Sequence, residues 1–171
     1  METIYIASTG DTPLGNLWLA CSEAGLIAVE FDMSRDKFAA YVQTRFKRPT
    51  KHAPKRLVTE TRQLREYLKG RRRKFTFPID WSVLRPFQQS ALRATYAIPF
   101  GETRTYGELA QEIGHPRAAR AVGRAEATNP MPLVIPCHRV VGTDGKLHGY
   151  GGGEGLPTKE WLLKLEGAVL A

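Results

Sequence analysis

The sequence predicts a small α/β domain at residues 1–80, followed by a mostly helical domain at residues 81–171. The first prediction depends on short runs of strand-forming residues before residue 32, followed by two amphipathic helical patterns. The second depends on a change to short helices after a proline-bounded linker, Pro78–Pro86. A chain of 171 residues has room for two such domains with modest cores.

Strands are predicted in the first domain at residues 3–7, 15–21 and 25–31, with a further short strand at Phe75–Phe77. These runs are rich in residues that favour extended backbone. Turn-forming residues separate the first three of them, which is typical of strands joined by short connections.

Two helices are predicted after these strands. Apolar residues recur every four positions in Arg35–Phe46, and a similar stripe in Leu57–Leu68 ends at Gly70. Pro49 and Pro54 bound a polar, basic segment between the helices, which is predicted to be a loop.

Three helices are predicted in the second domain, at Pro86–Ala97, Tyr106–Ile113 and Pro116–Ala127. Thr105 and Glu108 have the spacing of a capping box, which marks the start of the second helix. The last two helices are joined by a short turn that contains glycine, as in a helix-turn-helix. Many helical hairpins that bind nothing share this pattern.

One face of the last predicted helix is basic. At about 100° per residue, Arg117, Arg120 and Arg124 fall within roughly 60° of one another. Small residues supply most of the remaining positions, so the helix can approach a surface closely. A DNA-contacting helix needs this arrangement, and a solvated arginine face is the alternative interpretation.

The net charge of +8 and the pI of about 9.7 favour an acidic partner, nucleic acid foremost. Most of the excess lies in residues 45–74, which contain thirteen Lys and Arg residues against Glu60 and Glu66. This basic stretch is either a solvated face or a surface that attracts phosphate without specificity.

Cys21 and Cys137 are far apart, and no CxxC pair or Cys/His cluster accompanies them. The first residues show no basic start followed by an apolar block, so no signal peptide is expected, and no apolar run approaches the roughly eighteen residues that a membrane span needs. We therefore expect a cytoplasmic protein with free thiols, no metal, no cofactor and no membrane contact. An unpaired cysteine is most often a small buried hydrophobe.

The setting of Cys137 differs from that of an inert thiol. It lies between Pro136 and His138, at the end of an apolar stretch and beside a basic pair. The thiolate is the reactive form of cysteine, and nearby imidazole or positive charge lowers a thiol pKa toward neutrality. A histidine is also the commonest general base, and a bridging water would let His138 reach its neighbour.

The segment Ile135–Val140 resembles the active-site signature of the 6-O-alkylguanine-DNA alkyltransferases. Further blocks follow the family pattern in order: Thr105–Ala110, Ala118–Gly123, Asn129-Pro130, Tyr150–Gly153 and Lys159–Gly167. The match covers residues 86–167, and Thr12–Gly15 resembles the start of the family's N-terminal domain. The resemblance implies a ribonuclease H-like N-terminal domain and a winged helix-turn-helix in the C-terminal domain.

The resemblance also implies catalytic roles. Cys137 would be the nucleophile and permanent alkyl acceptor, and His138 would act through a water as its base. Glu166 would orient His138 and balance its charge, and Asn129 would hold the active-site turn. Tyr106 would hydrogen-bond or protonate the departing guanine and help to swing the nucleotide out of the stack.

The implied DNA and substrate contacts form a second set. Arg120 would enter the duplex where the flipped base had been, with Arg117 and Arg124 as further DNA contacts. The pocket would be lined by the ring of Tyr150 and the backbones of Cys137, Val140 and Gly151. The partner would be double-stranded DNA carrying 6-O-alkylguanine, with 4-O-alkylthymine as a second candidate substrate, and the protein would be monomeric in solution. Because a thioether is not readily hydrolysed, each molecule would react once.

Some positions depart from the family pattern. Glu126 replaces a small residue or an amide, and it lies about 160° from the arginine face, so we expect it to avoid DNA. Gly151 supplies a backbone donor where a hydroxyl is common, and the loop Glu154–Thr158 is a residue or two longer than usual. Of the zinc ligands that some relatives carry, only Cys21 has a counterpart, so no structural zinc is expected.

Three rival classes of protein were weighed. Alkyltransferase-like DNA-binding modules lack the acceptor cysteine, which Cys137 supplies here. Transcription regulators of the family carry a fused metal-binding sensor domain, for which we expect no room in this chain. A cysteine hydrolase needs an oxyanion hole aimed at an acyl group, and the sequence gives no sign of one.

Overall fold

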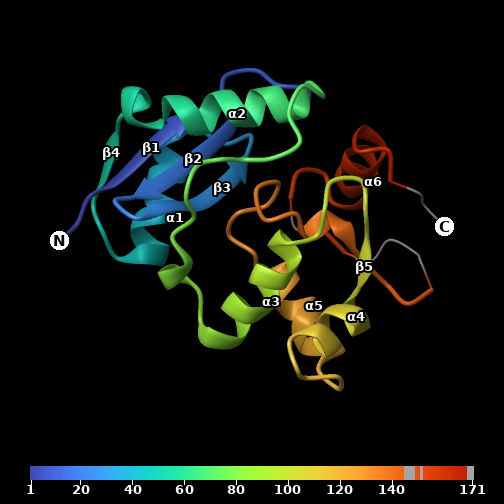
Figure 1. Ribbon diagram of the computed structural model, residues 1–171. Helices are drawn as coiled ribbons and strands as arrows, with labels where there is room; N and C mark the ends of the chain where they lie inside the picture. The colour runs from blue at the N-terminus through green and yellow to red at the C-terminus, as the bar shows by residue number, and fades with distance from the viewer. Residues whose placement is uncertain (145–148, 151, 169–171) are drawn as a thin grey trace. The chain divides into compact units, whose positions relative to one another are not determined.

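A computed structural model of the protein describes residues 1–144, 149–150 and 152–168 (Figure 1). The chain forms two compact units, Met1–Val83 and Leu84–Ala171. The first unit contains β1 (Ile4–Ser8), β2 (Leu17–Ser22), β3 (Gly25–Phe31), α1 (Arg35–Phe46), β4 (Thr50–His52), η1 (Pro54–Leu57), α2 (Val58–Leu68) and η2 (Trp81–Val83), where η marks a 3-10 helix. The second contains α3 (Pro86–Tyr96), β5 (Arg104–Thr105), α4 (Tyr106–Glu112), α5 (Ala119–Ala127), η3 (Cys137–Arg139), β6 (Val140–Val141) and α6 (Leu156–Leu165).

The first unit is built on a four-stranded sheet in the order β3-β2-β1-β4, along which α2 lies in Figure 1. Neighbours among β1, β2 and β3 are antiparallel. Every residue of β2 is buried, so both faces of the sheet are covered. On one face, Phe38 and Val42 of α1 pack with Ile4, Ile6 and Trp18. The predicted α/β character of this half is confirmed.

The segment between Pro49 and Pro54, predicted as a loop, contains a strand. β4 pairs in parallel with β1 over three residue pairs. Its side chains are partly or fully exposed, and it forms the edge of the sheet. Polar and charged residues are common on edge strands because they discourage pairing with other chains. The apolar alternation that predicts a strand is therefore missing here.

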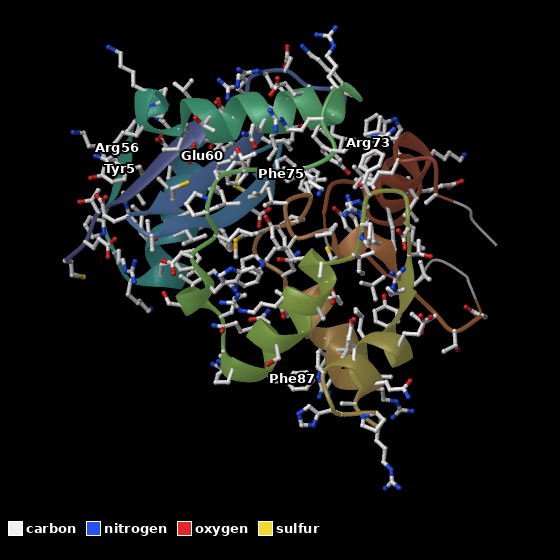
Figure 2. All side chains as sticks on the ribbon, in the orientation of Figure 1. Tyr5, Arg56, Glu60, Arg73, Phe75 and Phe87 are labelled. Atoms are coloured by element: carbon white, nitrogen blue, oxygen red, sulfur yellow. The ribbon has the colours of Figure 1, made fainter. Side chains whose placement is uncertain are left out.

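The strand predicted at Phe75–Phe77 is wrong, because these residues form no strand. The rings of Phe75 and Phe77 lie 5.4 Å apart, and Phe75 also contacts Tyr67 of α2 at 5.5 Å. Phe75 is labelled in Figure 2. The apolar residues here serve an aromatic cluster, and strand pairing is limited to a single bridge between Ile79 and Leu26.

The helices predicted in the second unit are present, with one correction. The capping box of α4 is formed, with Thr105 Oγ1 accepting from Glu108 N at 3.0 Å. α5 begins at Ala119 and not at Pro116, because residues 115–118 form a turn. Arg117 precedes the helix, so placing it on the face of α5 was wrong. α6 is a helix that the sequence analysis did not predict.

Two short strands bring distant segments of the second unit together. β5 and β6 pair in parallel, with Arg104 opposite Val140 and Thr105 opposite Val141. α4 starts directly after β5, and η3 ends directly before β6. The pairing therefore places the first turn of α4 near η3. No helix in the described part of the chain combines the length and hydrophobicity that a bilayer crossing requires.

Candidate active site

A cavity of about 300 Å³ lies beside Cys137 in the second unit. This volume is at the lower end of the range for small-molecule sites, about 300–1,000 Å³. Its walls come from α4, α5, η3 and the segment after β6. Its lining includes Tyr106, Gly123, Glu126, Cys137 and Tyr150. All of these except Glu126 come from four different sequence blocks that were predicted to act together.

The turn before Cys137 is held by Asn129. Its Oδ1 accepts a hydrogen bond from Met131 N at 2.9 Å, and its Nδ2 donates to the Ile135 carbonyl at 3.0 Å. Between these two contacts, Leu133 has a φ of +75°. This conformation costs a non-glycine residue about 1–3 kcal/mol, so the turn needs external support. The geometry agrees with the role predicted for Asn129.

Cys137 is the first residue of η3, and only 7% of its surface is exposed. Burial raises the pKa of the Cys137 thiol to about 12, and the charge of Glu126 raises it further, whereas a hydrogen bond with Asn129 opposes the rise. The basic pair that follows in the sequence had suggested a lowered pKa. The structure gives the opposite direction because desolvation dominates. At neutral pH the isolated protein holds a thiol.

His138 is fully buried, and its Nε2 lies 3.0 Å from Oε2 of Glu166. Burial lowers the pKa of His138 despite this contact, so the ring is neutral. Burial alone would raise the pKa of Glu166, but hydrogen bonds from His138 and Arg139 outweigh it and hold the pKa well below its usual range. An ionised carboxylate only accepts, so Nε2 carries the proton and Nδ1 is the basic nitrogen.

Arg139 is the cation that Glu166 neutralises. Its Nε and Nη2 contact Oε1 and Oε2 of Glu166, each at 2.8 Å, in a bidentate pair. Its Nη1 donates to the Ile98 carbonyl at 2.6 Å. The Glu166 side chain has no exposed surface, so this pair is protected from water and salt. The structure brings Glu166 to His138 as predicted and adds Arg139 as the charge partner.

Lys159 of α6 is almost fully buried, with 1% of its surface exposed. Its Nζ donates to the carbonyl of Val140 at 2.7 Å and to that of Gly149 at 3.4 Å. Burial lowers the pKa of Lys159 to about 8, and Cys137 and Glu126 oppose this shift when they are ionised. The ammonium group of Lys159 thus ties β6 to Gly149, which lines the cavity.

The predicted pocket residues lie largely where the sequence placed them. Tyr106 is half-buried at the start of α4, and burial raises the pKa of its phenol to about 12. Tyr150 lines the same cavity. Val140 is buried in β6, and its carbonyl accepts from Lys159. Gly151 lies outside the described residues, so its predicted contribution is untested.

The arginines predicted to contact DNA are exposed. Arg120 and Arg124 lie on α5, whereas Arg117 lies in the turn before it. Arg120 borders a surface groove of about 550 Å³ together with Tyr106 and Thr143. The groove and the cavity share Tyr106, so an exposed cation and the nucleophile border adjoining hollows of one unit.

Two protein-family models match the chain. One describes the DNA-binding domain of 6-O-methylguanine DNA methyltransferase and matches residues 86–168. The other describes the ribonuclease-like domain of the same family and matches residues 3–81. The chain belongs to the 6-O-methylguanine DNA methyltransferase family. It has the family's two-domain fold, with a ribonuclease-like N-terminal domain and a helical DNA-binding domain.

Relatives in the family match most of the chain. A methylated-DNA–protein-cysteine methyltransferase from Methanosarcina acetivorans is 41% identical over 92% of this chain and 96% of that protein. One from Salmonella typhimurium is 38% identical over 93% of this chain and 94% of that protein. The crystal structure of Mycobacterium tuberculosis OGT in complex with DNA matches at a TM-score of 0.76 and 37% identity, covering 96% and 92% of the two chains.

The sequence analysis gave no site role to three residues of this family member. Arg139 and Lys159 stood inside matched blocks, but their partners come from other parts of the chain. Glu126 was expected to point away from DNA, and it instead lines the cavity with Cys137. The only sign of this in the sequence was the position of Glu126 on the side of the helix opposite the arginines. A helical wheel does not show what that side packs against.

Proposed function

We propose that this protein repairs DNA by transferring an alkyl group from the 6-oxygen of guanine to Cys137, once per molecule. The observation that carries the proposal is the placement of Cys137 in the wall of a cavity, directly before a neutral His138 held by an ionised Glu166. Membership of the 6-O-methylguanine DNA methyltransferase family supports the choice of substrate. A 4-O-alkylthymine is the second candidate substrate.

The chemistry is a displacement at carbon. The Cys137 proton passes through a water to Nδ1 of His138, and the resulting thiolate attacks the alkyl carbon. A sulfur–carbon bond forms while the bond from that carbon to the guanine 6-oxygen breaks. The guanine leaves with the bond's electron pair and takes up a proton, for which Tyr106 is the donor or hydrogen-bond partner. The thioether stays on Cys137, so the protein is consumed.

The ion pair behind His138 explains how a buried base can act. When His138 gains a proton it becomes a buried cation, and the Glu166 carboxylate is already in contact with it. Arg139 keeps that carboxylate ionised beforehand. The relay therefore stabilises the charge that develops during reaction without reorganising water. Asn129 and Lys159 hold the turn and the far wall of the cavity during this step.

DNA recognition is assigned to the second unit. We infer that α4 and α5 form the helix-turn-helix and that the β5–β6 pair belongs to its wing. The alkylated base is stacked in the duplex, so it must flip into the cavity. Arg120, exposed beside the groove, would occupy the vacated space, and Arg124 would contact a phosphate. Arg117 remains a candidate phosphate contact from the turn before α5. We assign a monomer in the cytoplasm.

The test is intact mass after incubation with duplex DNA carrying 6-O-methylguanine. We expect one addition of about 14 Da, a single CH₂ group, on the peptide that contains Cys137. The Cys137→Ala variant should bind the DNA and gain no mass. If the wild-type protein binds without gaining mass, a non-catalytic DNA-binding module is the better interpretation.

A further inference from the structure

Glu126 is a buried acid in the wall of the reaction cavity. It lies on α5, 6% of its surface is exposed, and it shares the cavity with Cys137 and Tyr106. None of the steps proposed above uses it. Buried carboxyl groups are rare because the charged form loses its hydration, so such a group needs a partner or loses its charge.

The hydrogen bonds around Glu126 indicate which form it takes. Its Oε1 is in short contact with Oγ1 of Thr95, and the same hydroxyl lies 3.0 Å from the carbonyl of Ala91. Thr95 has one hydroxyl proton for two acceptors, the Ala91 carbonyl and Oε1 of Glu126. Both contacts are hydrogen bonds at once when Glu126 is protonated, because the carboxyl group can then donate to Oγ1 of Thr95. Burial raises the pKa of Glu126 to about 8, and the hydrogen bond with Thr95 opposes this rise only in part.

The other oxygen of Glu126 is left as an acceptor. Oε2 is buried and has no hydrogen-bond partner among the residues that the structure describes. An unsatisfied buried acceptor is costly, and a ligand that donates to it recovers that cost. Because the transferred group ends on Cys137, the part of the substrate nearest to this wall of the cavity includes the alkyl group.

We propose that Glu126 is a specificity-determining residue, whose neutral carboxyl favours adducts with a hydrogen-bond donor on the alkyl group, such as 2-hydroxyethyl, over apolar groups of equal size. The inference rests on the proposed alkyl transfer to Cys137. A buried polar group that pairs with one ligand and is left unpaired by a similar one separates the two ligands more strongly than a purely apolar pocket does. Selectivity here comes from one side chain of α5.

The neutral form of Glu126 also favours the reaction itself. Among the described residues, the ionisable groups that interact with Glu126 are Cys137 from η3, Lys159 from α6 and Tyr106 from α4. Tyr150 lines the same cavity, and α3 contributes the non-ionisable Thr95. The negative charge of an ionised Glu126 would repel a thiolate on Cys137. The positive charge of Lys159, whose Nζ is tied to backbone carbonyls, offsets only part of this repulsion. Ionisation of Glu126 at alkaline pH should therefore slow alkyl transfer.

The experiment compares single-turnover rates with duplexes carrying 6-O-(2-hydroxyethyl)guanine or 6-O-propylguanine, groups of equal heavy-atom count. E126Q keeps the shape, with its amide donating to Thr95 and its carbonyl oxygen in the place of Oε2. E126L removes the acceptor at similar size. The exposed Glu160 supplies the matched control, E160Q. We expect the wild-type, E126Q and E160Q proteins to share one hydroxyethyl-to-propyl rate ratio, and E126L to lower it about tenfold.

An equal ratio in E126L and the wild-type protein overturns the inference, while methyl transfer by both shows that the proposed function stands. Failure of methyl transfer by the wild-type protein would instead sink the proposed function. The second arm needs only E126Q, which keeps the buried contacts. The ratio of its methyl-transfer rate to the wild-type rate should rise from pH 6.5 to pH 9. A rate ratio that stays flat across this range contradicts a neutral Glu126.

Discussion

The ion pair of Glu166 with Arg139 gives the sharpest prediction for the Glu166→Gln variant. Glu166 accepts from His138 at 3.0 Å and from Arg139 at 2.8 Å twice, and its side chain has no exposed surface. Glutamine has one acceptor oxygen and no charge. The glutamine leaves the Arg139 guanidinium buried beside a neutral amide. The NH₂ group of that amide then points at a hydrogen-bond donor of His138 or Arg139.

Removing one partner of a buried ion pair costs about 3–5 kcal/mol, because the remaining charge is uncompensated. At about 2–4 °C per kcal/mol for a chain of this length, the melting temperature should fall by roughly 10 °C. Replacing Arg139 with Met as well removes the orphaned cation. The double variant should therefore be more stable than the sum of the two single losses predicts, by at least about 1 kcal/mol.

Thermal melts and alkyl transfer are measured on E166Q, R139M and the double variant. Alkyl transfer should slow at least about a hundredfold in E166Q, since His138 loses the carboxylate that stabilises its protonated form. Duplex affinity should stay unchanged. The folded-state pKa of Glu166 is depressed, so its contribution to stability is present above its unfolded pKa and is lost as the pH falls through the folded value. The reasoning would be refuted if the stability losses of the two single variants simply added in the double variant. It would also be refuted if E166Q lost stability at acid pH to the same extent as the wild-type protein.

Other residues of the second unit give further predictions. Arg120→Ala should weaken repair of duplex DNA far more than reaction with free 6-O-benzylguanine; equal losses would contradict an inserted arginine. Asn129→Ala removes both hydrogen bonds of the turn, so it should destabilise the protein by about 1–3 kcal/mol in denaturant titrations and slow alkyl transfer. Iodoacetamide labelling of Cys137 without DNA should be slow at pH 7 and accelerate through pH 9, and a plateau near pH 7 would contradict the raised pKa.

The elements that could be predicted from the sequence are those whose apolar side chains show which residues are buried. The buried strands β1 to β3 are rich in strand-forming residues, and the helices α1 and α2 carry an apolar stripe at helical spacing. β4 carries no apolar pattern, because an edge strand depends on pairing with β1 and not on burial of its own residues. Periodicity therefore finds elements that face the core and misses those held by backbone pairing.

The site shows the same division. Cys137 and His138 lie in one sequence block and Asn129 in the block just before it, and Asn129 donates to the Ile135 carbonyl two residues before Cys137. Arg117 was misplaced because Pro116 resembled a helix start, whereas the chain makes one more turn before α5. The place of Glu126 in the cavity was not predicted, because its environment is set by Thr95, thirty-one positions away in the sequence. Contacts of that kind are decided by packing between helices, which a single sequence does not display.

A protein that is consumed by its own reaction has to protect its nucleophile until the substrate arrives. Burial raises the pKa of Cys137 to about 12. At pH 7 the thiolate fraction is then on the order of 10⁻⁵, so oxidants and stray electrophiles meet an unreactive thiol. In the proposed mechanism, thiolate formation needs a base, His138, that is itself buried and neutral. The thiolate then forms when a water carries the Cys137 proton to His138, and it reacts with a base that has flipped into the cavity.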